Sequence, residues 1–440
     1  MIRLLFWSAV VAIAYTYVGY PLLVLARAAF RPRPPRSAPI VPSVSVVLAA
    51  RNEATVIGPR LENLLALDYP ADRLEIIVAS DGSEDDTVPI VRGFSDHGVR
   101  ILDLDRVGKA TALDAAVGLA TGEVLVFTDA NTMFEARALR ALVAAFADPG
   151  VGGVAGDQRY LPAERDADEA AEAAGERSYW DFERRLKLAE SAAGSTVSAT
   201  GAIYAIRREL FQPVIAGVTD DFITSTSVID QDRRLVFAPD AVAWEPVAAS
   251  SRLEYRRKVR IMTRGLRGVA ARRALLDPRR TGFYAVQLAS HKILRRLMAV
   301  PLLVVALGAP LLWGQGAIYQ LTTVGAAAVA GLGAVGLAAP ASRIGRHRVA
   351  GLASFFLLVN VASLEAAWNL LSGRTIERWE PGRAGGAGAP AASLGEQPGT
   401  SVDPAGPTVP VGAPGPVDPA EPSPRLDATG TGTGTGTGRG

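Results

Sequence analysis

Four stretches of the sequence are long and apolar enough to cross a lipid bilayer, which takes about 20 mostly apolar residues in a helix. The first covers residues 4–26, and the others cover 297–313, 317–339 and 349–371. The chain between the first and second stretches is far more polar. The pattern predicts an N-terminal transmembrane anchor (1–30), a large polar region and three further transmembrane helices (297–373).

Charges next to the apolar stretches indicate their orientation, because Lys and Arg accumulate on the cytoplasmic side. Arginines follow the first stretch, residues 314–316 carry no charge, and three arginines separate the last two stretches. We therefore expect a multi-pass plasma-membrane protein with residues 27–296 in the cytosol. A cleaved signal peptide is the alternative for 1–30, but its apolar part is too long and most of its basic residues follow it.

Composition excludes several classes of function. The chain has no cysteine, so disulfides, thiolate zinc sites and cysteine nucleophiles are absent, and its three histidines lie far apart. Lys and Arg number 46 against 44 Asp and Glu, which gives no bulk charge for binding nucleic acid. Residues 374–440 are rich in Gly, Pro and Thr and are predicted to be a disordered tail.

Within residues 40–250, short β-branched runs alternate with helical patterns. Residues 44–50, 74–79 and 123–128 are typical of buried strands, whereas 109–120 and the leucines of 61–67 indicate helices. This alternation predicts an α/β domain with a doubly wound sheet, in which ligands bind at the carboxyl ends of the strands.

Carboxylate and amide side chains follow three of these strands: Asn52 and Glu53, then Asp81, then Asp129 and Asn131. Because the strand ends share one edge, these side chains converge. Bare carboxylates repel an anionic ligand such as a nucleotide diphosphate, so a divalent cation held by oxygen ligands is the physical bridge. The alternative is that each residue only caps the helix after its strand.

Asp220 and Asp221 are two adjacent acids in a largely apolar segment. A carboxylate shielded from water can accept a proton from an attacking hydroxyl, which makes either one a candidate general base. Acids that stabilise a helix N-terminus are the alternative.

A basic run at 256–264 follows on a predicted helix, where Arg257, Arg260 and Arg264 share one face. That face can bind a pyrophosphate or anionic lipid headgroups. An amphipathic helix over 283–297 is expected to lie on the membrane surface, which makes His291 and Lys292 interfacial rather than catalytic. Residues 251–296 are thus predicted to be basic and amphipathic interfacial helices.

The order of these motifs resembles the membrane-bound family-2 glycosyltransferases with a GT-A fold, the group of cellulose, chitin and hyaluronan synthases. The resemblance covers roughly residues 15–371. It rests on Asn52-Glu53, Ser80-Asp81-Gly82-Ser83, Gly108-Lys109, Thr128-Asp129-Ala130-Asn131, Thr200-Gly201-Ala202, Thr219-Asp220-Asp221 and the basic run.

The resemblance implies a doubly wound mixed sheet and transfer of a sugar from a nucleotide sugar, expected to be a UDP-sugar. Asn52, Glu53 and Asp81 would hold the uridine, and Lys109 would lie near the nucleotide. Asp129, with Asn131, would bind Mg²⁺ or Mn²⁺ on the diphosphate. Asp221 would be the catalytic base. Arg257 and Arg260 would bind the diphosphate. Thr200, Gly201 and Asp220 would bind the acceptor.

Two departures from the family pattern bear on function. Asn131 replaces the second acid of the D-x-D motif, so we expect metal binding to be weaker or to be completed by water and substrate oxygens. Ile261 replaces the tryptophan of the Q-x-x-R-W motif, and Arg257 replaces its glutamine, which argues against polymer synthesis. Three interpretations remain. The first is an inverting transferase that extends a polysaccharide, for which export subunits are possible partners. The others are a non-processive transferase to a lipid and a catalytically silent scaffold of an envelope polysaccharide assembly.

Overall fold

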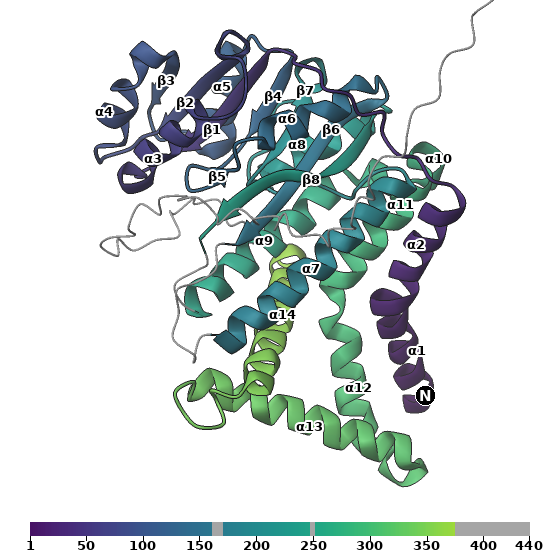
Figure 1. Ribbon diagram of the computed structural model, residues 1–440. Helices are drawn as coiled ribbons and strands as arrows, with labels where there is room; N and C mark the ends of the chain where they lie inside the picture. The colour runs from purple at the N-terminus through teal and green to yellow at the C-terminus, as the bar shows by residue number, and fades with distance from the viewer. Residues whose placement is uncertain (161–169, 247–250, 375–440) are drawn as a thin grey trace, which may run out of the picture. The chain divides into compact units, whose positions relative to one another are not determined.

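The computed structural model describes residues 1–160, 170–246 and 251–374 (Figure 1). The predicted tail, 374–440, lies outside these residues except for Arg374.

An eight-stranded mixed sheet forms the polar domain, with the strand order β3-β2-β1-β4-β7-β6-β8-β5. β1 pairs in parallel with β2 and β4, whereas β7 is antiparallel to both β4 and β6. The α/β prediction with a doubly wound mixed sheet is confirmed. The strands are β1 (Val44–Ala50), β2 (Leu74–Asp81), β3 (Val99–Leu104), β4 (Val124–Phe127), β5 (Met133–Phe134), β6 (Val151–Tyr160), β7 (Tyr204–Arg207) and β8 (Arg234–Glu245).

Helices cover both faces of the sheet because successive side chains of a strand point to opposite faces. On one face Val46 and Leu48 pack with α3 and α6, and on the other Val47 and Ala49 pack with α5 and α8. All seven residues of β1 are buried, as expected for a central parallel strand. The helices of this domain are α3 (Ala54–Leu65), α4 (Thr87–Arg92), α5 (Lys109–Leu119), α6 (Ala138–Val143), α7 (Ala170–Ala193) and α8 (Asp220–Asp230).

Three described helices are long and apolar enough to cross a bilayer. They are Ile2–Phe30, α13 (Ala317–Ala338) and α14 (Arg348–Leu371). A fourth candidate is a pair bent by 47°, Phe283–Leu297 with α12 (Ala299–Leu311). The first of these helices consists of α1 (Ile2–Ala14), a π-helical turn η1 (Tyr15–Gly19) and α2 (Tyr20–Phe30).

The helix α13 crosses the ends of its neighbours instead of lying alongside them (Figure 1). Near its start, Tyr319 accepts a hydrogen bond from Trp7 of α1 (3.1 Å), and near its end Gly333 packs against Leu357 of α14. α14 then returns toward the sheet domain. A hydrogen bond from Ser363 to the carbonyl of Arg296, just before α12, shows this return. Both ends of α13 therefore lie at the end of the apolar helices that is remote from the sheet.

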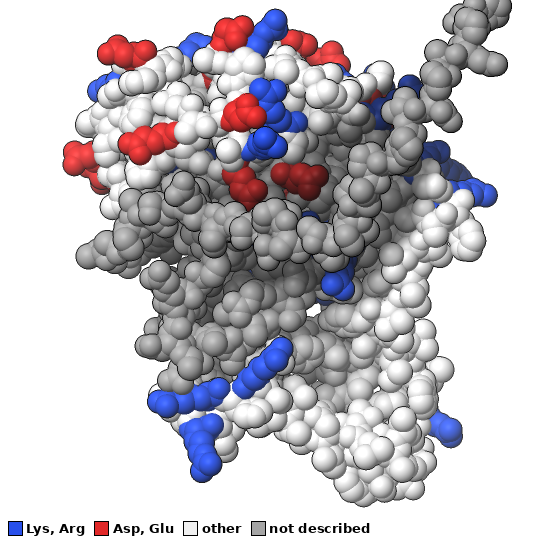
Figure 2. Space-filling model, in the orientation of Figure 1, with Lys and Arg blue, Asp and Glu red and all other residues white. Residues whose placement is uncertain are grey.

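The position of the arginine-rich segment between α13 and α14 therefore differs from the sequence prediction. That prediction placed the segment on the same side of the membrane as the sheet domain. In Figure 2 blue side chains lie over this segment at the lower edge, away from the acidic and basic side chains of the sheet domain. Charge counting assigns a loop to one side without knowing how the helices pack. Here α13 packs across the bundle, so the loop that carries Arg343, Arg346 and Arg348 stays at the remote end.

The expected amphipathic helix over 283–297 is instead a series of short helices packed against the sheet domain. It comprises α11 (Phe283–Gln287), a π-helical segment η7 (Leu288–Leu294) and η8 (Arg295–Leu297). Tyr284 and Leu288 join the core beneath the sheet, and His291 is only 7% exposed. The interfacial placement of His291 and Lys292 was therefore wrong, because the polar face of this segment lies against protein. The basic helix α9 (Ser251–Ala271) precedes it and packs on α14.

A buried carboxylate joins the N-terminal helix to this segment. Glu190 of α7 is fully buried and accepts hydrogen bonds from the Tyr20 hydroxyl (2.5 Å) and from the backbone N–H of Val197 (3.3 Å). His291 Nδ1 lies 2.7 Å from the same carboxylate. A buried charge is tolerated only with such partners.

Replacing Tyr20 by Phe should lower the thermal unfolding temperature of the detergent-purified protein, because it removes one partner of this buried carboxylate. We expect a loss of about 1.5–3 kcal/mol. Tyr15→Phe is the matched control: its hydroxyl lies 2.8 Å from that of Ser290, a neutral pair, so the loss should be about 0.5–1.5 kcal/mol. Equal unfolding temperatures of the two variants would contradict the importance of the carboxylate.

Candidate active site

The ammonium group of Lys109 lies between two carboxylates that are far apart in the sequence. Its Nζ is 2.8 Å from Asp129 Oδ1 and 3.0 Å from Asp220 Oδ2. Lys109 begins α5, directly after Gly108 with φ +89°, Asp129 follows β4, and Asp220 begins α8. These two acids raise the pKa of Lys109 although burial opposes the shift, so the lysine stays charged. The structure thus brings three predicted site residues together.

Asp221 lies in the first turn of α8 next to this cluster, and its Oδ1 accepts a hydrogen bond from the N–H of Phe222 (2.8 Å). Burial, and then the negative charge of Asp220, raises the pKa of Asp221 from the ordinary 3.8 to about 6. The positive charge of Lys292, the hydrogen bond from the Phe222 N–H and the positive charge of Lys109 oppose this shift. A carboxylate with such a pKa is ionised at neutral pH and still basic enough to take a proton.

Asp81 holds the loop that leads into Lys109. Its Oδ1 accepts hydrogen bonds from the N–H groups of Val107 (2.8 Å) and Gly108 (2.7 Å). The chain can turn closely here because Gly82 has φ +64°, and a Cβ at that position would lie 2.9 Å from the Arg106 nitrogen. Asp81 therefore fixes the start of α5, and its predicted contact with a nucleoside stays a prediction.

Asn52 and Glu53 tie the loop after β1 to the loop after β2. Asn52 has φ 51°, and its Oδ1 accepts a hydrogen bond from the N–H of Glu84 (2.8 Å). The N–H of Glu53 donates to the Thr87 hydroxyl (2.8 Å). These contacts position the loops at the carboxyl edge of the sheet, where the sequence predicted a nucleotide.

The segment after residue 199 borders Asp129. A Cβ on Gly201 would lie 3.1 Å from Asp129 Oδ2, so only glycine leaves this carboxylate undisturbed. The hydroxyl oxygen of Thr200 is buried and makes no hydrogen bond within the described residues. Gly201 thus lies beside Asp129, and the predicted contact of Thr200 and Gly201 with the acceptor stays a prediction.

Arg60 is a site residue that the sequence analysis missed. It is fully buried, its guanidinium lies 4.3 Å from the Phe134 ring centre, and it donates to the Thr128 hydroxyl (2.8 Å), which in turn donates to the carbonyl of Ala202 (2.8 Å). Burial lowers the pKa of Arg60 to about 9, and Asp129 opposes the shift, so it is charged at neutral pH. Arg60 braces the strand end that carries Asp129.

The predicted basic face of α9 is oriented toward the acids. Burial, and then Arg264 and Arg257, lower the pKa of Arg260, whereas Asp129 and Asp220 raise it. Asp129 and Asp220 are thus among the charges that act on Arg260.

Arg257 lies beside Glu245, with its Nη2 3.7 Å from Glu245 Oε2. Burial, and then Asp129, raise the pKa of Glu245. Arg257 is thus linked to the acidic cluster through Glu245, and its predicted binding of a diphosphate stays a prediction.

The residues around Asp129 suit a divalent cation only if the substrate supplies further oxygens. No group of three His, Cys, Asp or Glu side chains in the described part of the chain could hold a metal. Asp129 offers one carboxylate and Asn131 one amide oxygen. Mg²⁺ is commonly held by one or two carboxylates together with substrate phosphates, and this donor set fits that pattern.

Comparison with known proteins identifies the domain. The model of the family described as Glycosyl transferase family 2 matches residues 45–214, which hold all strands from β1 to β7. The chain carries a family 2 glycosyltransferase domain.

The solved structure of a mannosyltransferase from Pyrobaculum calidifontis, in complex with GDP-Man and Mn²⁺, is similar over 84% of this chain and 99% of that protein, with 26% identity and a TM-score of 0.63. This likeness supports the GT-A fold of the domain.

Two curated relatives extend the comparison. The poly-β-1,6-N-acetyl-D-glucosamine synthase of Staphylococcus epidermidis is 26% identical over 46% of this chain and 50% of its own length. The β-monoglucosyldiacylglycerol synthase of a Synechocystis species is 32% identical over 25% of this chain and 24% of its own length. The chain thus spans half or less of these relatives.

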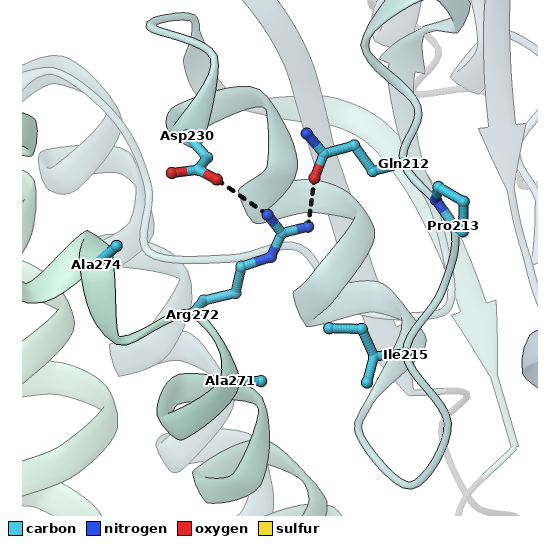
Figure 3. A pocket seen from close by; sticks show the side chains of 7 residues that line it. All are labelled: Gln212, Pro213, Ile215, Asp230, Ala271, Arg272 and Ala274. Carbon is cyan, nitrogen blue, oxygen red and sulfur yellow. Dashed lines mark hydrogen bonds and ion pairs between the residues drawn. The ribbon is translucent and has the colours of Figure 1, made fainter.

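A separate cavity of about 380 Å³ lies at the far end of α8 (Figure 3). Its one arginine, Arg272, donates to Asp230 (3.1 Å) and Gln212 (2.7 Å). The cavity contains none of the predicted site residues, so the candidate active site is the cluster around Lys109. It is lined by Gln212, Pro213, Ile215, Asp230, Ala271, Arg272 and Ala274.

The raised pKa of Asp221 predicts a pH-dependent gain in stability for Asp221→Asn. The amide cannot ionise, whereas the wild-type carboxylate is charged in the unfolded chain above pH 3.8 but in the folded protein only above about 6. The variant should therefore gain stability over wild type as the pH rises from about 4 through about 6. Thermal unfolding at pH 4 to 8 measures this difference.

Asp220→Asn is the control, because it removes a partner of Lys109 and should destabilise the protein at neutral pH. An Asp221→Asn difference that does not vary with pH would contradict the pKa assignment.

Proposed function

We propose that the protein transfers a sugar, with inversion, from a nucleoside-diphosphate sugar to a hydroxyl of a lipid or saccharide acceptor at the cytosolic face of the membrane. The observation that carries this proposal is the position of Lys109. It joins the strand end of a nucleotide-binding sheet, at Asp129, to the helix that bears Asp220 and the basic carboxylate Asp221.

In this reaction Asp221 accepts the proton of the acceptor hydroxyl while the hydroxyl oxygen forms a bond to the anomeric carbon. The bond from that carbon to the diphosphate breaks on the opposite face, and its electron pair leaves with the nucleotide. Arg257 and Arg260 bind the departing diphosphate, for which the forked guanidinium is suited. A Mg²⁺ or Mn²⁺ held by Asp129 and Asn131 would supply further charge stabilisation there.

For the donor we propose a UDP-sugar, held at the edge formed by Asn52, Glu53 and Asp81. The structurally similar mannosyltransferase binds GDP-Man, so a guanosine donor is the competing outcome. A panel of radiolabelled UDP- and GDP-sugars, offered with a membrane lipid extract, distinguishes the two.

For the acceptor two features favour a lipid. Ile261 stands where processive synthases resembling this chain have a tryptophan, and α9 packs on the apolar helix α14, where Asn369 lies 3.5 Å from Thr263. The polysaccharide synthase among the relatives supports a saccharide acceptor instead, and export subunits would then be partners. Single-sugar lipid products favour the first, and long chains the second.

Asp221→Asn should lower the rate of transfer by about 100- to 10,000-fold, because general-base assistance is lost. The measurement is transfer of the radiolabelled sugar by the purified, detergent-solubilised chain. Asp240→Asn, the same change at an exposed acid, is the control and should retain wild-type turnover. Unchanged turnover in Asp221→Asn would refute the assignment of the base.

The pH profile provides an independent check. Since Asp221 must be ionised, kcat/KM should fall as the pH drops below about 6. Lys292 lowers the pKa of Asp221, so Lys292→Met should move this limb to higher pH. The control Lys258→Met removes a lysine whose Nζ lies 5.2 Å from the Phe355 ring and should leave the limb in place. A limb that shifts equally in both variants would exclude a specific effect on Asp221.

A further inference from the structure

The ammonium of Lys109 contacts one of the two oxygens with which Asp129 could bind a divalent cation. It lies 2.8 Å from Oδ1, while Oδ2 lies beside Gly201, whose lack of a side chain leaves that oxygen uncrowded. The side chains of Lys109 and Asp129 are 18% and 35% exposed, so water screens the pair only in part. A cation on Asp129 must therefore either displace Lys109 from Oδ1 or bind Oδ2 close to the positive charge of Lys109.

The protein has few other groups that would stabilise a metal at Asp129. Asn131 provides a neutral amide where a second carboxylate would attract the cation, and the described residues contain no group of three acids or histidines suited to a metal. Mg²⁺ and Mn²⁺ without a nucleotide should thus compete poorly with an ammonium that is already in place.

When a nucleotide diphosphate binds, the metal competes better with the Lys109 ammonium for Asp129. Its anionic oxygens give the metal the ligands that the protein lacks, and they give Lys109 an alternative partner. A lysine is a point charge on a flexible four-carbon stem, so it can turn from Asp129 to a phosphate while Asp220 holds it nearby. Asp81 keeps the base of the stem fixed throughout.

We propose that Lys109 is a latch on the metal site: it blocks Asp129 until a nucleotide diphosphate arrives, so that metal and donor bind only together. The latch rests on the proposed function, since it assumes a nucleoside-diphosphate donor. It makes the two affinities reciprocal, with the nucleotide strengthening metal binding and the metal strengthening nucleotide binding by the same factor.

The test is a titration of the purified full chain with Mn²⁺ alone, followed by the electron paramagnetic resonance signal of free Mn²⁺ and then repeated with UDP and with GDP. Wild type should bind Mn²⁺ alone weakly and gain affinity with one nucleotide. Lys109→Met should bind Mn²⁺ alone roughly tenfold more tightly and gain less from the nucleotide. Asp129→Asn should bind Mn²⁺ weakly in every condition.

A second variant changes the latch in the opposite direction and does not remove the lysine. Asp220→Asn deletes the competing partner of Lys109, so the lysine is held more firmly on Asp129 and Mn²⁺ alone should bind more weakly than in wild type. Equal Mn²⁺ affinities in wild type, Lys109→Met and Asp220→Asn would overturn the latch. So would Mn²⁺ binding that survives in Asp129→Asn.

The outcome for the latch is separate from that for the proposed function. If Lys109→Met raises the Mn²⁺ affinity but the wild-type protein transfers no sugar from any nucleotide sugar, the latch stands and the transferase assignment fails. If transfer occurs and the Mn²⁺ affinity does not depend on Lys109, the transferase assignment stands and the latch fails.

Discussion

Charge compensation by Lys109 is the constraint on which the site depends. Asp129 and Asp220 come from two elements and both lie within 3.0 Å of one ammonium, so their like charges repel each other across the site. The ammonium offsets this repulsion. Its position follows in turn from Asp81, which fixes the loop before α5 through two backbone hydrogen bonds. The strand ends and α8 are therefore held together by electrostatics as well as by packing.

The sequence predicted the sheet and much of the site because both follow local rules. The apolar run of β1 and the acids after β2 and β4 are visible in the chain, and parallel strands place their carboxyl ends at one edge. The pairing of Lys109 with Asp129 and Asp220 was not visible, because it depends on how α5 and α8 pack.

Arg60 was missed for a different reason: a single arginine in a leucine-rich helix normally lies on the exposed face. Its spacing did carry a signal. Ile57, Arg60, Leu61 and Leu64 recur at helical intervals, which places the arginine on the buried stripe of α3, and all four are fully buried. A cation within an apolar stripe indicates a buried polar partner, and Thr128 supplies it.

Hydropathy located the apolar helices but not the side chains that connect them to the domain. His291 and Lys292 have the spacing of an interfacial helix, yet their polar face meets Glu190 and the site of Asp221. A polar face satisfied by a buried carboxylate has the same sequence pattern as one satisfied by water. Lys292 and Arg260 consequently belong to segments that pack near α14 while their charges act on the acids of the candidate site. The basicity of Asp221 therefore depends on Lys292, a charge from a segment outside the sheet domain whose packing the sequence did not predict.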